Sequence, residues 1–197
     1  MRTGLSFRAR GIGTIQRLTM KTKQTTYSFM LLFTASLPAH AAIDTAVGKV
    51  NADFRLRYEA VDQDNAAKDA SALTVRSKVN LKTVSHNGFY GFFELENTTA
   101  LIDDFNDALG SNTEYSVVAD PNATELDQAF LGFNNDKFHV KLGRQVITMD
   151  NHRFVGHVGW RQDKQTFDAV TASFKASKKL KVTYSYINKR NRILSDE

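Results

Sequence analysis

The feature that most constrains the fold is a strict alternation of apolar and polar residues. Over residues 50–60 one face of the chain carries only apolar side chains, namely Val50, Ala52, Phe54, Leu56, Tyr58 and Ala60. A period of two is that of a β-strand, and eleven residues is about the length of a tilted strand that crosses a membrane. The chain has no cysteine, and its mean hydropathy of -0.37 is too polar for a bundle of membrane helices. The sequence therefore predicts an all-β protein.

The alternation recurs, and the connections between its segments differ in length. Six further strands are predicted near residues 73–82, 89–96, 125–133, 138–145, 167–176 and 180–186. Long connections, at 62–71, 97–124 and 148–165, alternate with short ones at 86–88, 134–136 and 177–179. Outer-membrane barrels sort their loops in this way. We expect about seven strands of an antiparallel transmembrane β-barrel; a secreted β-sandwich that binds an acidic polysaccharide remains the alternative, since its strands alternate too.

The polar faces of these strands are predominantly basic. Basic side chains that the alternation aims at the lumen are Arg55, Arg57, Arg76, Lys78, Lys82, Lys141, Lys175 and Lys181, against the acidic Asp53, Glu59, Glu94 and Glu96. Rings of basic side chains in a pore favour anions, and arginine binds a carboxylate in bidentate fashion. The sequence predicts a pore for a uronate or another organic acid. Alternatively, these charges pair with one another and stiffen the barrel.

Arg144 and Asp168 interrupt the alternation. Simple parity places both on the lipid-facing side, where an arginine at the bilayer midplane costs about 2 to 4 kcal/mol. Gly143 offers a position for a β-bulge that turns Arg144 inward. We therefore include Arg144 among the pore-lining residues.

The N-terminal part has the pattern of an export signal. From Met20, basic residues precede the apolar run FMLLFTASL and then the small-residue site Ala39-His40-Ala41. We expect a signal peptide at residues 20–41, cleaved after Ala41, and an upstream extension at 1–19, for which a genuine basic arm is the alternative. Residues 1–41 hold six of the 26 basic residues and no acidic one, so 20 basic residues face 21 acidic ones in 42–197. A nucleic-acid partner is therefore not expected.

Enzyme motifs are weak. Asp150, His152 and His157 lie close together in one predicted loop, but their spacing matches no standard metal motif. The chain lacks a glycine-rich phosphate loop, G-x-S-x-G and H-E-x-x-H. We expect no enzymatic activity, no metal and no cofactor.

Four stretches resemble the alginate-export family of outer-membrane porins. They are ELDQAFLGF at 125–133, LGRQ at 142–145, MDNHRFVGHVGWRQDKQTFDA at 149–169 and YSYINKRNRIL at 184–194. The resemblance implies a barrel of about eighteen strands in the bacterial outer membrane, with a basic pore for anionic polysaccharide or a related acidic solute. It also implies outer-membrane lipid, lipopolysaccharide and the barrel assembly machinery as partners. Residues that match the family's polar positions, and that bind solute or brace an inward-folded loop, are Arg144, Arg153, Arg161 and Gln162.

The predicted strand number departs from that family. Seven is odd and below the smallest single-chain bacterial barrel. The end of the chain, LSDE, also lacks a final amphipathic strand with a terminal aromatic residue. We therefore expect the chain to correspond to the N-terminal part of a longer porin, with 42–197 as its barrel segment.

Overall fold

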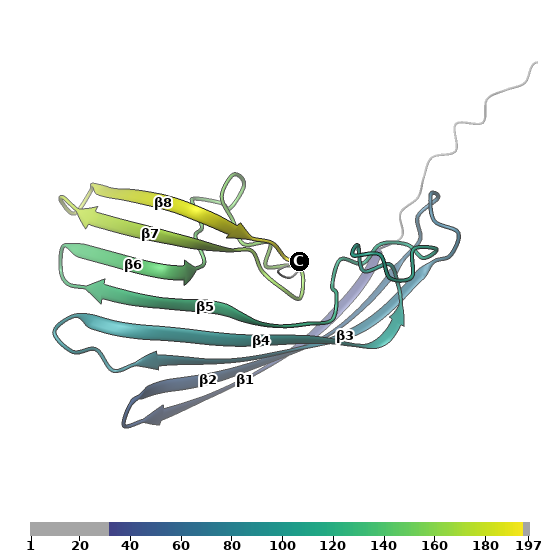
Figure 1. Cartoon of the computed structure of the whole chain (residues 1–197), viewed down its shortest axis with the longest axis horizontal. Helices are drawn as coiled ribbons and strands as arrows, with labels where there is room; N and C mark the ends of the chain where they lie inside the picture. The colour runs from purple at the N-terminus through teal and green to yellow at the C-terminus, as the bar shows by residue number, and fades with distance from the viewer. Residues whose placement is uncertain (1–31, 195–197) are drawn as a thin grey trace, which may run out of the picture.

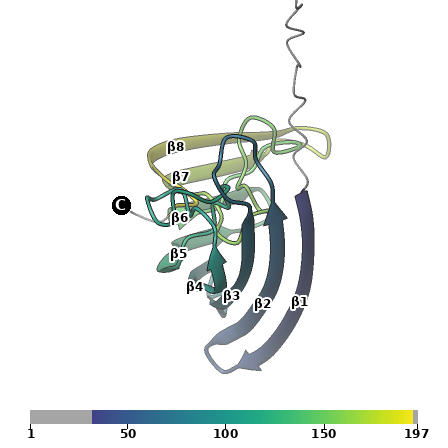
Figure 2. The same cartoon turned by 90° about the vertical axis from the view of Figure 1, so that its right-hand side faces the viewer.

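The computed structural model describes residues 32–194, which form one antiparallel sheet. Each strand pairs with its neighbours in the sequence, in the order β1 to β8, and the sheet is open and strongly curved (Figures 1 and 2). The strands are β1 (Leu32–Thr45), β2 (Gly48–Val61), β3 (Ala70–Thr83), β4 (Phe89–Asp104), β5 (Ala123–Asn134), β6 (Phe138–Gln145), β7 (Thr166–Lys175) and β8 (Lys181–Asn191). Within residues 32–194 no helix has the length and apolar character needed to span a membrane.

Seven of these strands are those that the alternation predicts, and the eighth is β1. β1 overlaps the second half of the predicted signal peptide and pairs with β2 along its whole length. The predicted extension and the first part of that signal lie outside the described residues. The prediction of a loop from residue 97 was wrong, because β4 continues to Asp104. The polar residues of β4 after Glu96 belong to the strand and not to a loop; Thr98, for example, faces the covered side of the sheet and is 3% exposed.

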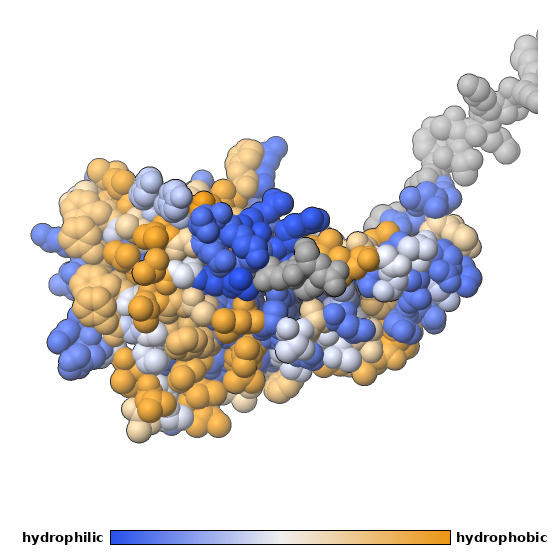
Figure 3. Space-filling view, in the orientation of Figure 1, coloured by the Kyte–Doolittle hydropathy of each residue, from blue (hydrophilic) through white to orange (hydrophobic). Residues whose placement is uncertain are grey.

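The two faces of the sheet invert the distribution found in a water-soluble protein. On the convex face large apolar side chains are open to the surroundings, for example Leu95 at 58% exposure and Leu142 at 55%. Charged side chains of the concave face are buried, with Arg57 at 4% and Glu96 at 3%. Figure 3 shows the apolar side chains spread over the part of the molecule where the strands lie. Since residues 32–194 contain no second sheet to cover the apolar face, the β-sandwich alternative is wrong.

The short turns gather at one end of the sheet, on the left in Figure 1, and aromatic side chains accompany them. Phe89 packs against Phe133 with ring centroids 4.8 Å apart, and Phe138 stacks on Phe174 at 4.9 Å. An aromatic band at the end of the strands is typical of a membrane interface.

Two connections at the opposite end fold back over the concave face (Figure 2). Residues 105–122 contribute Phe105 and Val118 to a small apolar core with Val61 of β2 and Ala72 of β3. Residues 146–165, called the inner loop below, are held through a second core in which Ile147 contacts Phe167 and Ala169 of β7. Both connections are therefore packed parts of the fold that occupy the interior of the curved sheet.

Candidate functional site on the concave face

A four-charge cluster binds both connections to β2. Its members are Arg57, Glu59, Asp120 and Arg161, which we call the anchoring cluster. Arg57 forms ion pairs with Glu59, at 2.5 Å, and with Asp120. Arg161 lies 3.1 Å from Glu59 and 3.7 Å from Asp120. Two guanidinium groups thus balance two carboxylates, and none of these four side chains is more than 11% exposed.

Gln162 extends this attachment to three elements and is fully buried. Its side-chain carbonyl accepts a hydrogen bond from Arg55 Nε at 2.7 Å, and its amide nitrogen donates to Thr74 Oγ1 at 2.7 Å. Its backbone N–H donates to Asp120 at 2.9 Å, and its backbone carbonyl accepts from Arg76 at 3.2 Å. Of the two roles left open for the family's polar positions, Gln162 and Arg161 take that of bracing an inward-folded loop.

A second group of charges joins the inner loop to β4 and β5. Lys164 forms ion pairs with Glu94 and, at 2.7 Å, with Asp127. Asp127 is the extra residue of a β-bulge, since Glu94 pairs with Gln128 and the next residue of β4 pairs with Leu126. The bulge interrupts the alternation of β5, because it turns both Asp127 and its neighbour Gln128 toward the concave face.

The inner loop carries two strongly perturbed ionisable groups. Burial raises the pKa of Asp163 to about 9, and the nearby carboxylates Glu125 and Glu96 raise it as well. Burial alone would lower the pKa of Lys164, but Asp127 and Glu94 hold it above its ordinary value. Lys164 is therefore charged, whereas Asp163 is neutral at pH 7.

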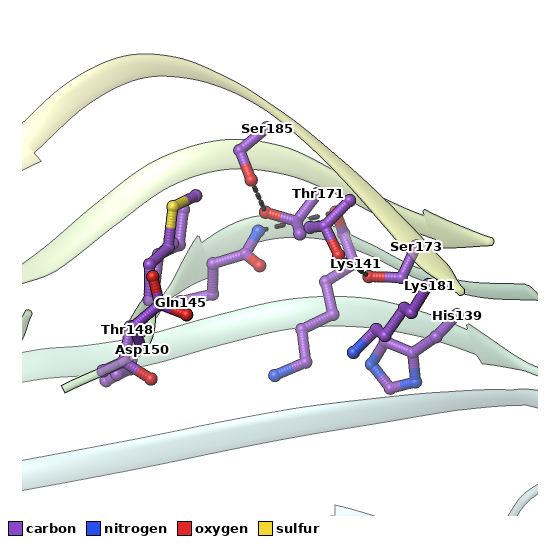
Figure 4. Close-up of a pocket in the computed structure, with 13 residues that line it drawn as sticks. His139, Lys141, Gln145, Thr148, Asp150, Thr171, Ser173, Lys181 and Ser185 are labelled. Atoms are coloured by element: carbon purple, nitrogen blue, oxygen red, sulfur yellow. Dashed lines mark hydrogen bonds between the residues drawn. The ribbon is translucent and has the colours of Figure 1, made fainter. Parts of the chain in front are cut away.

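Beside the inner loop, the concave face of β6 to β8 forms an open hollow of about 520 Å³. His139, Lys141 and Lys181 extend into it (Figure 4). Its wall is polar, because a ladder of hydroxyl groups crosses β7 and β8 through Thr171–Ser185 at 3.1 Å and Ser173–Thr183 at 2.9 Å. The hollow thus combines cationic groups with hydroxyl groups, which can both bind an anionic, hydroxylated ligand.

Lys82 of β3 belongs to the same basic group, because His139 interacts electrostatically with Lys141, Lys181 and Lys82. Lys82 lies over the ring of Tyr90 at 4.8 Å, and Lys141 over that of Phe130 at 4.7 Å. Within residues 32–194, no ion pair joins Lys82, Lys141 or Lys181 to an acidic group. We call Lys82, His139, Lys141 and Lys181 the basic patch.

The predicted pore-lining residues therefore divide into separate groups. Arg55 and Arg57 contact residues of the connections, and Arg161, on the inner loop, pairs with Glu59 and Asp120. Arg76 and Lys78 both pair with Asp53, Lys78 at 3.8 Å. These five side chains thus contact other groups of the chain, which for the four on the strands corresponds to the alternative of charges that pair with one another, and Lys82 and Lys141 lie in the basic patch.

Arg144 faces the opposite side from the one predicted. It forms an ion pair across the sheet with Asp168 at 2.9 Å. It lies two residues from the outward-facing Leu142, and its partner Asp168 lies two residues from Val170, so Arg144 faces outward as well. Gly143 has a positive φ of 127°, but the register through β6 is uninterrupted and Arg144 stays on the convex face. Its charge is compensated there by Asp168, so no inward turn is needed. The assignment of Arg144 to the pore was wrong.

Arg153 is also away from the concave clusters. It lies near the tip of the inner loop with its guanidinium 5.5 Å from the ring centre of Phe154, and it is exposed. His152 and His157, in the same loop, have ring centres 5.1 Å apart.

An antiparallel sheet with apolar side chains outside and a charged, loop-filled interior has the construction of an outer-membrane β-barrel wall. A comparison of the sequence with models of known families identifies the family to which the chain belongs. The model of the alginate-export family matches residues 48–186, and the chain belongs to that family. This is a family of outer-membrane porins, which are transporters and not enzymes. Comparison with curated proteins and with solved structures gave no match.

Sequence reasoning missed three buried charged groups of the site. Asp120, Asp163 and Lys164 lie in stretches that were predicted only as long connections, yet each is at least 88% buried. No period of two marks loop residues, so their burial left no signal in the pattern. The bulge at Asp127 does have a signature in the sequence, since the adjacent polar residues Asp127 and Gln128 break the alternation of β5.

Proposed function

We propose that the protein is an outer-membrane channel that passes anionic solutes, with acidic polysaccharides built from uronate units as the preferred class and smaller organic acids as a second. The observation that carries this proposal is the basic patch. Its lysines are not neutralised within the described chain, and two of them, Lys141 and Lys181, border a hollow with a hydroxyl-lined wall. A uronate presents one carboxylate and several hydroxyl groups per unit, which match these two kinds of binding group.

The arrangement supports passage of solute and not tight capture. The patch is open, and lysine binds a carboxylate as a mobile point charge and not in the bidentate geometry of arginine. The arginines that would bind more rigidly are already paired with Asp53, Glu59 and Asp120. Conduction requires sites that attract a solute and also release it, and the basic patch has that character.

We also propose that the protein is exported by means of the predicted signal peptide, which is cleaved after Ala41. Residues 32–41 lack the alternation of the other strands, and Pro38, which has no N–H to donate, stands in the middle of β1. Cleavage would leave Ala42–Thr45 paired with β2 and make β2 the first long strand of the mature chain.

Binding of an oligouronate to the protein in detergent micelles tests the proposed solute. We expect Lys141→Gln to weaken binding roughly tenfold, since a hydrogen bond to a charged group contributes about 1.5 kcal/mol. Lys179→Gln, in the exposed turn between β7 and β8, is the matched control and should leave affinity unchanged. A neutral oligosaccharide of the same length should bind more weakly than the oligouronate. Equal affinity for the two sugars, or equal affinity of the two variants, would contradict the proposal.

A further inference from the structure

Two carboxyl groups enclosed between the inner loop and the sheet have oxygen atoms without hydrogen-bond partners. Glu96, on β4, is 3% exposed, and neither of its carboxylate oxygens has a partner. Asp163, on the inner loop, is 6% exposed, and its Oδ2 has none. The other oxygen of Asp163 accepts a hydrogen bond from the backbone N–H of Lys164 at 2.5 Å.

The neighbouring charges do not supply the missing partners. Lys164 is paired with Glu94 and Asp127. The basic groups of β3 that act on Glu96 are Arg76 and Lys78, and both are paired with Asp53. The carboxylates of β4 and β5 that face Asp163 are Glu96, Glu125 and Asp127. Acidic groups thus meet here from three elements.

A buried carboxylate without a partner is unstable, and the instability grows where other carboxylates are close. Protonation removes the charge and also provides an O–H donor. The pKa of Asp163, raised to about 9 by burial and by Glu125 and Glu96, shows the same preference for the neutral form. The seated loop therefore holds a proton that Asp163 would lose in water, where an aspartate has its ordinary pKa of about 4.

We propose that Glu96 and Asp163 form a proton-dependent latch that keeps the inner loop seated on the concave face, and that loss of the proton releases the loop from the pore. The inference concerns gating and does not depend on which solute passes. Seating is fully favoured in acid. It weakens as pH rises above the ordinary pKa of aspartate, because only the seated state then carries the proton, and the loss ends near pH 9.

Trypsin provides a direct readout of the latch in the full-length chain in detergent micelles. It cleaves after Arg161 and Lys164, which are 11% and 12% exposed while the loop is seated. Lys178, in the exposed β7–β8 turn, is an internal reference that does not depend on the loop. We expect the ratio of cleavage at 161 and 164 to cleavage at 178 to rise about tenfold per pH unit between pH 7 and about 9, one proton being released per opening.

Substitution of the latch separates this mechanism from general alkaline loosening. Asp163→Asn should flatten most of the rise, and Glu96→Gln with Asp163→Asn should abolish it. Asp136→Asn, at an exposed carboxylate of the β5–β6 turn, should keep the wild-type profile. The proposal is overturned if the wild-type ratio is constant from pH 7 to 9, or if Asp163→Asn rises as steeply as wild type. Should the variants fail to fold, the wild-type profile decides alone.

Discussion

Arg57→Ala is expected to lower the free energy of unfolding by about 3 kcal/mol. The substitution leaves Glu59 and Asp120 in the anchoring cluster with Arg161 as their remaining cation, and both carboxylates are at most 2% exposed. Breaking a buried ion pair by removing one partner costs about 3 to 5 kcal/mol, and Arg161 compensates for a part of that here. Equilibrium denaturant unfolding in lipid vesicles, followed by the β-sheet signal, measures the change.

Two further variants make this result specific to charge pairing. Arg153→Ala removes an exposed arginine of the inner loop and should change stability by less than about 0.5 kcal/mol. Asp120→Asn combined with Arg57→Ala should cost less than the sum of the two single substitutions, because the double variant lacks the orphaned charge. Strictly additive losses, or equal effects of Arg57→Ala and Arg153→Ala, would show that the cluster does not anchor the loops.

Val170→Arg is expected to destabilise the protein in a bilayer by about 2 to 4 kcal/mol, the cost of an arginine near the midplane of a lipid-facing strand. Val170 lies in the middle of β7 on the convex face, where it pairs with Leu142 and Tyr186. The adjacent Thr171 faces the hollow, so Thr171→Arg, which loses the hydrogen bond to Ser185, should cost only about 1 kcal/mol.

Folding of both variants into the same vesicles gives the comparison. In water, an arginine at a site that is already 37% exposed would change stability by no more than about 0.5 kcal/mol. A smaller loss for Val170→Arg than for Thr171→Arg would mean that the convex face does not contact lipid.

Much of the sheet was predictable because the period of two is imposed by two different environments. Phe93 and Leu95 face outward while Glu94 and Glu96 face inward, as the alternation of β4 predicts. The sorting of connections by length was predictable for the same strands. β1 was not, because residues 32–41 carry no alternation, and its pairing with β2 is visible only in the structure.

The division of the basic residues was less predictable than their orientation. The alternation places Arg57 and Lys141 on the same face of the sheet. Arg57 pairs with Asp120 and Lys141 lines the hollow because of where the folded connections lie, which the alternation does not predict. Contacts between residues more than 60 positions apart are set by packing of the connections and have no local signature. Arg144 shows the reverse case, where simple parity was right and the expected bulge did not redirect the side chain.

The central claim is that successive side chains of β7 face lipid and water in turn, and cysteine scanning tests it most directly. The chain has no native cysteine, so single substitutions at Val170, Thr171, Ala172, Ser173 and Phe174 give clean labels. We expect a water-soluble thiol reagent to label positions 171 and 173, and lipid-borne quenchers to reach probes at 170, 172 and 174. Uniform labelling of all five positions from water would contradict the account.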